Sequence, residues 1–318
     1  MFDRPKIKLG ISACLLGEEV RYDGGHKLDR FLRDTLGGYV EFVPVCPEVE
    51  AGFNTPREPF RLVGDPDNPC FITVNSKVDH TQQMTEWSRK RAAELAREDL
   101  CGFIFKSGSP SSGMERVKVY TEKGMPVKKG VGVFPRAFME RFPLLPVEEE
   151  GRLHDPGLRE NFIERIFALG RWREICAQRK NRGRLVQFHA RHKLLIMSHS
   201  QAHLTRMGRL VARAKDTPSG ELYAEYQRLL LESLKLKATG KKHANVLRHI
   251  QGYFKRLLTG DEKREIGEVI ENYRRGEYPL IVPITLLNHY VRKYEQPYLE
   301  EQFYLQPHPL ELKLRNHV

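Results

Sequence analysis

Short apolar runs alternate with longer amphipathic segments in the first half of the chain. The runs at 7–13, 40–45 and 102–106 are rich in β-branched and aromatic residues, which is typical of strands buried on both faces of a parallel sheet. Between them, residues 26–36 and 81–99 carry apolar side chains at helical spacing. This alternation predicts an α/β fold with a Rossmann-like, mostly parallel sheet and helices on both faces.

The second half has a different pattern, in which nearly every segment has the spacing of a helix. The predicted helices cover 157–168, 183–215, 219–236, 241–258, 261–276 and 282–293. A stretch near 146–160 that is rich in Pro, Gly and acidic residues separates the two patterns. We therefore expect an α/β domain over residues 1–150 and an all-α domain over residues 151–318.

The net charge of +12 is concentrated in the second predicted domain. Residues 1–150 hold 22 Lys and Arg against 23 Asp and Glu, whereas residues 151–318 hold 31 against 18. A surplus of this size in one domain favours a polyanionic partner, usually nucleic acid, over a surface that is charged only for solubility.

Several classes of protein are disfavoured by what the sequence lacks. No run approaches the ~20 apolar residues that a membrane-spanning helix needs, and the charged start MFDRPKIK lacks the apolar core of a signal peptide. Five cysteines at scattered spacings suit a reducing compartment better than a disulfide framework. We therefore expect a cytoplasmic protein with no membrane partner, and no pattern indicates a protein partner. The sequence contains neither GxGxxG nor a Walker A motif, so a dinucleotide or P-loop site has no local support.

Each predicted strand is followed by a polar loop that carries a chemically capable side chain. Cys14 follows the first strand, Cys46 follows the second, and the loop SGSPSSG at 107–113 follows the third. Because the carboxyl ends of parallel strands meet at one edge of a sheet, we expect the three loops to line one pocket. Cys14 and Cys46 could be ordinary buried thiols. Glu48, close to Cys46 in the sequence, instead favours a metal or cluster site with a proton-transfer group.

The N-terminal half resembles the thiouracil desulfidase family in three stretches, GISACLLGEEVRYDGG, CPEVEAGFNTPREP and FKSGSPSSGMERVKVY. The C-terminal half, with FHARHKLLIMSHS and HANVLRHIQGYFK, resembles the helical domain that is fused to this one in bacterial tRNA 4-thiouridine desulfidases. The resemblance implies a 4Fe-4S cluster that is held by three cysteines and leaves its fourth iron open. It also implies non-redox removal of sulfur from a thiolated pyrimidine.

The resemblance assigns Cys14 and Cys46 as two cluster ligands and Glu48 as the general acid or base. The family's third ligand is the cysteine of an S-P-S-C-G loop, and Ser112 stands at that position here. Ser109 matches a pocket serine that positions the base or the water. From the residues alone, the less favoured alternative for Glu48 is a solvated rim charge or a helix N-terminal group, and the alternative for Ser109 is a simple turn serine. A serine hydroxyl is a poor substitute for thiolate on iron, so we expect a labile cluster or none.

The helical half carries candidate RNA-binding residues of two kinds. One is a stripe of histidines on a single predicted helix with a neighbouring lysine: His189, His192, Lys193, His199 and His203. An RNA-facing surface and a buried polar network explain this stripe equally well, and a metal site ranks last because no acidic residue completes it. The other is a set of cations interleaved with aromatic residues: Lys241, Lys242, Arg248 and Lys255. A charged helix face over an aromatic anchor explains this second set as well.

These observations favour a tRNA 4-thiouridine desulfidase with tRNA as its partner. One alternative is an RNA-binding protein whose cluster pocket has decayed through Ser112. Another is a desulfidase of free thiouracil, for which the charge surplus of residues 151–318 has no explanation.

Overall fold

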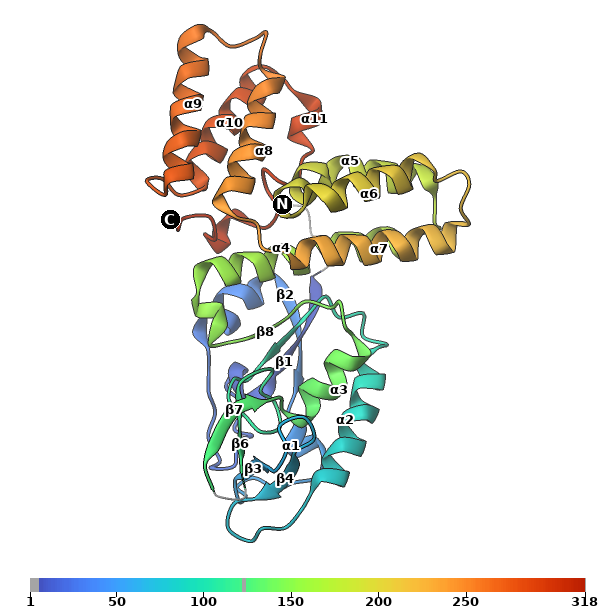
Figure 1. Ribbon diagram of the computed structural model, residues 1–318, viewed down its shortest axis with the longest axis vertical. Helices are drawn as coiled ribbons and strands as arrows, with labels where there is room; N and C mark the ends of the chain where they lie inside the picture. Colours follow the sequence, from blue (N-terminus) through green and yellow to red (C-terminus); the bar gives the residue numbers. More distant parts are fainter. Residues whose placement is uncertain (1–5, 122–123, 318) are drawn as a thin grey trace. The chain divides into compact units, whose positions relative to one another are not determined.

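The computed structural model describes residues 6–121 and 124–317 and divides into two compact units, Met1–Asp155 and Pro156–Val318 (Figure 1). We call them the α/β unit and the helical unit. The sequence pattern placed the division between residues 150 and 151. The acidic run at 148–150 belongs to the α/β unit because it begins inside the last strand of its sheet. The first five residues, part of the charged start noted above, lie outside the described residues.

A four-stranded sheet of order β2-β1-β5-β8 forms the framework of the α/β unit. Its strands are β1 (Ile7–Ser12), β2 (Val40–Val45), β5 (Phe103–Phe105) and β8 (Val147–Glu149). All neighbouring strands in it run parallel, which confirms the predicted mostly parallel sheet. The register pairs Ser12 with Val45, so β1 and β2 end level with each other. The segments that follow β1, β2 and β5 therefore leave the sheet at the same edge.

Two helices, α2 (Thr81–Leu95) and α3 (Val133–Arg141), lie side by side against one face of this sheet (Figure 1). Aromatic side chains of β5 and α3 form the core between the two layers. Phe103 packs over Gly10 so closely that a Cβ at Gly10 would lie 2.2 Å from a carbon of its ring. Glycine is therefore the residue that allows β1 and β5 to pair beneath this aromatic core.

The helix predicted at 26–36 is mostly absent. In its place stand two single turns, η2 (Phe31–Thr35) and η3 (Leu36–Gly38). The backbone N–H groups of Lys27 and Asp29 donate to the carbonyls of Cys14 and Leu15 at 2.9 Å each. Those bonds hold residues 27–29 in a non-helical course beside η1 (Ala13–Leu16), so the helical turns begin only after them.

A second, mixed sheet of order β4-β3-β6-β7 was not predicted from the sequence. Its strands are β3 (Phe60–Val63), β4 (Cys70–Thr73), β6 (Val117–Tyr120) and β7 (Pro126–Gly130). Leu62, Phe71, Val117 and Val119 form its buried core together with Met84 of α2. The loop after β5 leads into this second sheet, since β6 begins a few residues beyond that loop.

The helical unit confirms the predicted all-helical second half. Its helices are α4 (Pro156–Cys176), α5 (Arg182–His199), α6 (Gln201–Ala212), α7 (Ser219–Lys235), α8 (Gly240–Tyr253), α9 (Gly260–Arg275), α10 (Ile281–Lys293) and α11 (Pro297–Glu300). Across residues 6–121 and 124–317, none of the helices combines the length and the apolar character that a bilayer crossing requires.

The prediction of one long helix over 183–215 is wrong, because the helix is interrupted at Ser200. Ser200 is extended, with φ −159° and ψ 111°, and its hydroxyl accepts a hydrogen bond from the backbone N–H of His203 at 3.3 Å. This is the geometry of a helix N-cap, which starts α6 and ends α5. The two helices lie next to each other as a hairpin (Figure 1).

Candidate functional site

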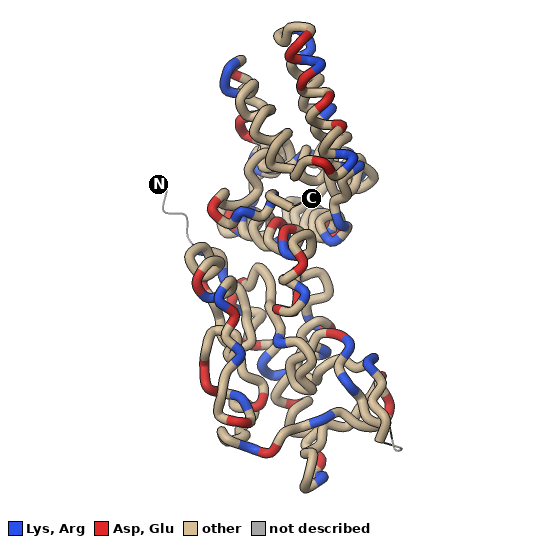
Figure 2. Tube along the Cα trace, turned by 90° about the vertical axis from the view of Figure 1, so that its left-hand side faces the viewer, with Lys and Arg blue, Asp and Glu red and all other residues tan. Residues whose placement is uncertain are grey.

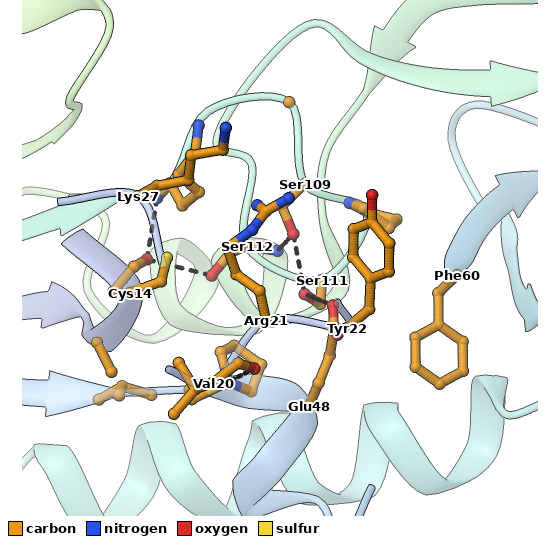
Figure 3. A pocket seen from close by; sticks show the side chains of 18 of the residues that line it. Cys14, Val20, Arg21, Tyr22, Lys27, Glu48, Phe60, Ser109, Ser111 and Ser112 are labelled. Atoms are coloured by element: carbon orange, nitrogen blue, oxygen red, sulfur yellow. Dashed lines mark hydrogen bonds between the residues drawn. The ribbon is translucent and has the colours of Figure 1, made fainter. Parts of the chain in front are cut away.

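The segments that follow β1, β2 and β5 line one cavity of about 310 Å³ in the α/β unit. Cys14 lies in η1 directly after β1, and Cys46 directly follows β2. The loop at residues 107–113, which we call the serine loop, follows β5 and brings Ser112 to the same cavity (Figure 3). The predicted shared pocket is therefore confirmed. Cys101, at the start of the β5 segment, does not line it.

Burial favours the protonated form of both cavity thiols by raising their pKa. Burial raises the pKa of Cys14 to about 11, with a further contribution from the neighbouring Cys46, while Lys106 and Arg21 oppose the rise. Burial also raises the pKa of Cys46, against the backbone N–H groups of Val49 and Glu48. A metal ion binds the thiolate, so binding at this site has to displace both protons.

Ser112, which the resemblance places at the third ligand position, lines the same cavity as Cys14 and Cys46. It is 5% exposed, and its Oγ lies 3.3 Å from the Oγ of Ser12. Ser12 in turn accepts a hydrogen bond from the backbone N–H of Lys106 at 2.9 Å. In the part of the chain that the structure describes, no three His, Cys, Asp or Glu side chains gather in a group able to hold a metal ion. The donor set thus fits a 4Fe-4S cluster at two positions and offers a hard hydroxyl at the third.

A fixed carboxylate faces the same cavity. Glu48 lies on the one-turn helix α1 (Pro47–Glu50), and its Oε2 accepts a hydrogen bond from Nε of Arg57 at 2.7 Å. Its Oε1 accepts one from the hydroxyl of Ser111 at 2.6 Å. The side chains of Arg57 and Glu48 are only 8% and 13% exposed. Arg57 also donates to the carbonyl of Val20 at 2.9 Å, which ties the loop after β1 to the same guanidinium.

Ser111 is the cavity residue that sequence reasoning missed. Ser109 was expected to position the base, but its hydroxyl lies 3.0 Å from that of Ser111, and Ser111 is the residue that donates to Glu48. The backbone N–H of Ser112 donates to Ser109 Oγ at 3.2 Å. The loop therefore carries a chain of hydroxyls that ends on the carboxylate. The signal was available, since Ser111 stands in the same SPSSG stretch.

The serine loop is clamped from two sides. The carboxylate of Glu150 accepts hydrogen bonds from the backbone N–H and the hydroxyl of Ser107, both at 2.7 Å, and pairs with Lys106. The backbone N–H of Gly132, at the start of α3, donates to the carbonyl of Gly113 at 2.8 Å, and that of Phe134 donates to Ser111 at 3.1 Å. The acidic run that sequence reasoning assigned to the domain boundary therefore anchors the site.

Comparison with known proteins adds to this geometry. A family model described as 2-thiouracil desulfurase matches residues 9–150, and one described as a protein of unknown function, DUF1722, matches residues 193–309. The uncharacterized protein YbgA of Escherichia coli is 33% identical over 158 residues, which are 49% of this chain and 94% of that protein. The chain belongs to the 2-thiouracil desulfurase family. Its residues 193–309 add a DUF1722 region.

Two further similarities concern parts of the chain. The uncharacterized protein YbbK of Bacillus subtilis is 33% identical over 108 residues, which are 32% of this chain and 71% of that protein. A solved structure of the [4Fe-4S]-dependent thiouracil desulfidase TudS is 29% identical, with a TM-score of 0.39, and the alignment covers 47% of this chain and 95% of that one.

In the helical unit of this family member, two of the predicted RNA-facing histidines are buried, so that part of the prediction is wrong. His192 is 1% exposed and His199 is 0% exposed. His192 accepts a hydrogen bond from Nε of Arg171 at 3.0 Å. The Nε2 of His199 lies 3.3 Å from the carboxylate of Glu164. The alternative of a buried polar network is correct for this pair.

The two outer histidines of the stripe are also engaged within the unit. His189 bonds the hydroxyl of Tyr226 at 3.1 Å, and burial lowers its pKa to about 4. His203 stands on α6 rather than α5, and its Nδ1 lies 2.8 Å from the hydroxyl of Ser200. Because α5 ends at His199, the four side chains do not form one exposed stripe.

The predicted cations divide differently. Lys242 is half-buried and donates through Nζ to the carbonyl of His199 at 2.7 Å, so it caps the C-terminal end of α5. The others are exposed: Lys193, Lys241, Arg248 and Lys255. Arg248 pairs with Glu271 at 3.0 Å. Lys and Arg positions are spread over several helices of this unit (Figure 2). The exposed cations are therefore the part of the predicted RNA surface that stays accessible.

Proposed function

We propose that this chain is a tRNA 4-thiouridine desulfidase that replaces the sulfur of a thiolated pyrimidine by oxygen without net redox chemistry. The observation that carries the proposal is the single cavity in which Cys14, Cys46 and Ser112 meet the fixed carboxylate of Glu48. That cavity lies within the region matched by the 2-thiouracil desulfurase model. The choice of tRNA rests on the charge surplus of residues 151–318 and on the exposed cations there.

Cys14 and Cys46 are the residues that would hold a 4Fe-4S cluster, with Ser112 at the third position. When bound, such a cluster with an open iron supplies a Lewis acid for the thiocarbonyl sulfur. The cavity and the two thiols suit that group. The hydroxyl of Ser112 does not, because it is far less acidic than a thiol and its oxygen is a hard donor.

The side chains of the cavity accept and pass on the protons of the reaction. Water adds to the thiocarbonyl carbon, the C–S bond breaks, and the products are a carbonyl and hydrosulfide. Glu48 accepts the proton of the attacking water, and it can do so in one orientation only, because Arg57 holds Oε2. The hydroxyls of Ser111 and Ser109 lead from Oε1 along the serine loop, so they can orient the base or pass a proton to it.

Release of sulfide from 4-thiouridine in tRNA tests the proposal, with free 2-thiouracil as the competing substrate. The assay uses the Ser112→Cys chain after anaerobic reconstitution, because the third ligand is then present. We expect tRNA to be the better substrate and Glu48→Gln to lose roughly 10²- to 10⁴-fold in rate. Turnover of free thiouracil but not of tRNA would favour the free-base alternative. A loaded cluster with no turnover of either substrate would contradict the desulfidase assignment.

Binding of tRNA to the full chain, without any cluster, tests the partner. We expect the affinity to fall steeply as salt rises, because each neutralised phosphate releases counterions. The double variant Lys241→Ala and Lys255→Ala should weaken binding and reduce the salt slope by about two contacts. Lys118→Ala, which removes an exposed lysine of β6, is the matched control and should change neither value. Salt-independent binding would contradict the proposed partner.

A further inference from the structure

The hydroxyl of Ser112 has a hydrogen-bonding role that is independent of any metal. Ser12, the last residue of β1, is 2% exposed, and its Oγ accepts a hydrogen bond from the backbone N–H of Lys106 at 2.9 Å. Within residues 6–121 and 124–317, the only acceptor seen for the proton of the Ser12 hydroxyl is the Oγ of Ser112, at 3.3 Å. A buried hydroxyl rarely leaves its proton unpaired, so Ser12 donates to Ser112. The proton of the Ser112 hydroxyl is then available to another acceptor.

This available donor belongs to the wall of the cavity. Ser112 lines the cavity, and in the part of the chain that the structure describes its Oγ has no hydrogen-bond partner besides Ser12. The backbone N–H of Ser112 donates to the Oγ of Ser109 at 3.2 Å, which fixes the backbone that carries the hydroxyl. A hydroxyl that accepts a hydrogen bond is polarised and becomes a stronger donor. Ser112 therefore offers an oriented donor to a molecule that enters the cavity.

Glu48 offers the complementary acceptor in the same cavity. Its Oε2 accepts from Nε of Arg57 at 2.7 Å, and its Oε1 accepts from the hydroxyl of Ser111 at 2.6 Å. Each oxygen of a carboxylate can accept two hydrogen bonds, so Oε1 can take one more. Figure 3 shows Glu48 and Ser112 at this one cavity. The two residues together present a fixed donor and a fixed acceptor.

Phe60, the first residue of β3, adds an aromatic wall to the cavity. Its ring stacks on that of Phe71 with ring centres 4.4 Å apart, and the ring of Phe53 packs against it at 4.8 Å. Two neighbouring rings therefore hold it in place. An aromatic side chain of this kind packs well against a planar heterocycle, whichever base it is.

We propose that Ser112 and Glu48 bind the amide edge of a pyrimidine in the chain as written, without iron. The hydroxyl of Ser112 donates to a ring carbonyl or thiocarbonyl, and Glu48 accepts the adjacent ring N–H. Uracil and its thio derivatives carry an N–H beside a C=O or C=S group. The inference rests on the proposed function for the class of base. It goes beyond that function because the serine that is unsuited to iron becomes a binding residue for the base itself.

Calorimetric titration of the full chain as written, in the presence of EDTA, tests the proposal. The probes are uracil, 2-thiouracil and 1,3-dimethyluracil, in which methyl groups replace both ring N–H groups. We expect uracil and 2-thiouracil to bind, and 1,3-dimethyluracil to bind at least about tenfold more weakly, because Glu48 loses its donor. Ser112→Ala should weaken uracil binding about three- to tenfold, as for one neutral hydrogen bond. Ser76→Ala removes an exposed hydroxyl outside the cavity, so it is the matched control and should leave the affinity unchanged.

The proposal is overturned if uracil does not bind, if uracil and 1,3-dimethyluracil bind equally, or if Ser112→Ala keeps the affinity of the chain as written. Uracil binding that appears only after iron is added would also overturn it, because position 112 would then act through a metal. Urea unfolding checks that Ser112→Ala is folded, and the comparison of uracil with 1,3-dimethyluracil needs no variant.

Failure of this inference is separate from failure of the proposed function. Sulfide release by the reconstituted Ser112→Cys chain, with no uracil binding to the chain as written, would remove the inference and leave the desulfidase. Uracil binding to the chain as written, with no sulfide release by the reconstituted Ser112→Cys chain, would do the reverse.

Discussion

Replacing Arg57 by Ala should destabilise the α/β unit by about 3–5 kcal/mol, the usual consequence of removing one partner of a buried ion pair. The guanidinium donates to Glu48, to the carbonyls of Val20 and Asn54, and to the hydroxyl of Thr55. Its removal strands the Glu48 carboxylate, which is 13% exposed, with Ser111 as its remaining partner. Three segments that shape the cavity lose their common anchor at the same time.

Urea unfolding followed by tryptophan fluorescence measures this change. The chain has two tryptophans, so a Trp172→Phe background leaves Trp87, which packs against both hydrophobic clusters of the α/β unit. With a slope of about 2 kcal/mol per molar urea, the midpoint of this unit should fall by roughly 2 M. The midpoint of Arg57→Lys should lie between those of the unsubstituted chain and Arg57→Ala, because an ammonium has three donors but lacks the planar fork of a guanidinium.

The matched control is Arg33→Ala, which breaks a solvent-exposed pair with Asp34 in the same unit. It should leave the midpoint unchanged, because exposed pairs contribute little. If Arg57→Ala costs less than about 1 kcal/mol, the guanidinium is not the anchor of the site and the reasoning about Glu48 is refuted.

Two further predictions concern a close approach and a pH dependence. Gly132→Ala should destabilise the α/β unit by about 1–3 kcal/mol, because its Cβ would lie 2.9 Å from the backbone nitrogen of Gly113. Gly38→Ala, with open space around its Cβ, is the control, and equal effects of the two substitutions on the urea midpoint would contradict the prediction. The helical unit should lose stability as pH falls from about 6.5 towards 4. Burial holds the pKa of four of its histidines well below 6.5: His189, His192, His243 and His308. The unfolded state therefore binds more protons than the folded state in that pH range. Each extra proton lowers the free energy of unfolding by about 1.4 kcal/mol per pH unit. Glu160, whose pKa burial raises to about 8, opposes this by one proton. Urea unfolding of the helical unit can be followed by the fluorescence of Trp172 in a Trp87→Phe background. An unfolding midpoint that is the same at pH 7 and pH 5 would contradict the predicted loss of stability.

The parallel sheet and the cavity could be predicted from the sequence because both follow from local signals. The continuous apolar runs predicted strands that are buried on both faces, which holds for β5 and for the second half of β1, whereas Glu41 and Pro44 of the edge strand β2 are exposed. The polar loops after the three strands had to share the carboxyl edge of the sheet. The second sheet gave no such signal. Its strands have only four or five residues and become strands through pairing with one another.

The helical half was harder because its decisive contacts are distant in sequence. The spacing of His192 and His199 suited an exposed RNA-facing stripe and a buried polar network equally well. The structure buries both against Arg171 and Glu164, which stand on α4. Periodicity identifies a face and does not say what covers it. Ser200 could have been recognised as a cap, since a serine followed three residues later by a polar residue is a common helix start. The run of apolar and basic residues across it hid the break.

Iron content after anaerobic reconstitution of the Ser112→Cys chain, beside the chain as written and Ser112→Ala, tests the central claim most directly. The claim is that Cys14, Cys46 and position 112 form one cluster site with a missing third ligand. We predict about four irons per chain for Ser112→Cys, retained on desalting and accompanied by sulfide release from 4-thiouridine in tRNA. The other two chains should retain little iron. The account is contradicted if Ser112→Cys holds no more iron than the chain as written, or if the chain as written already holds a full cluster and turns over.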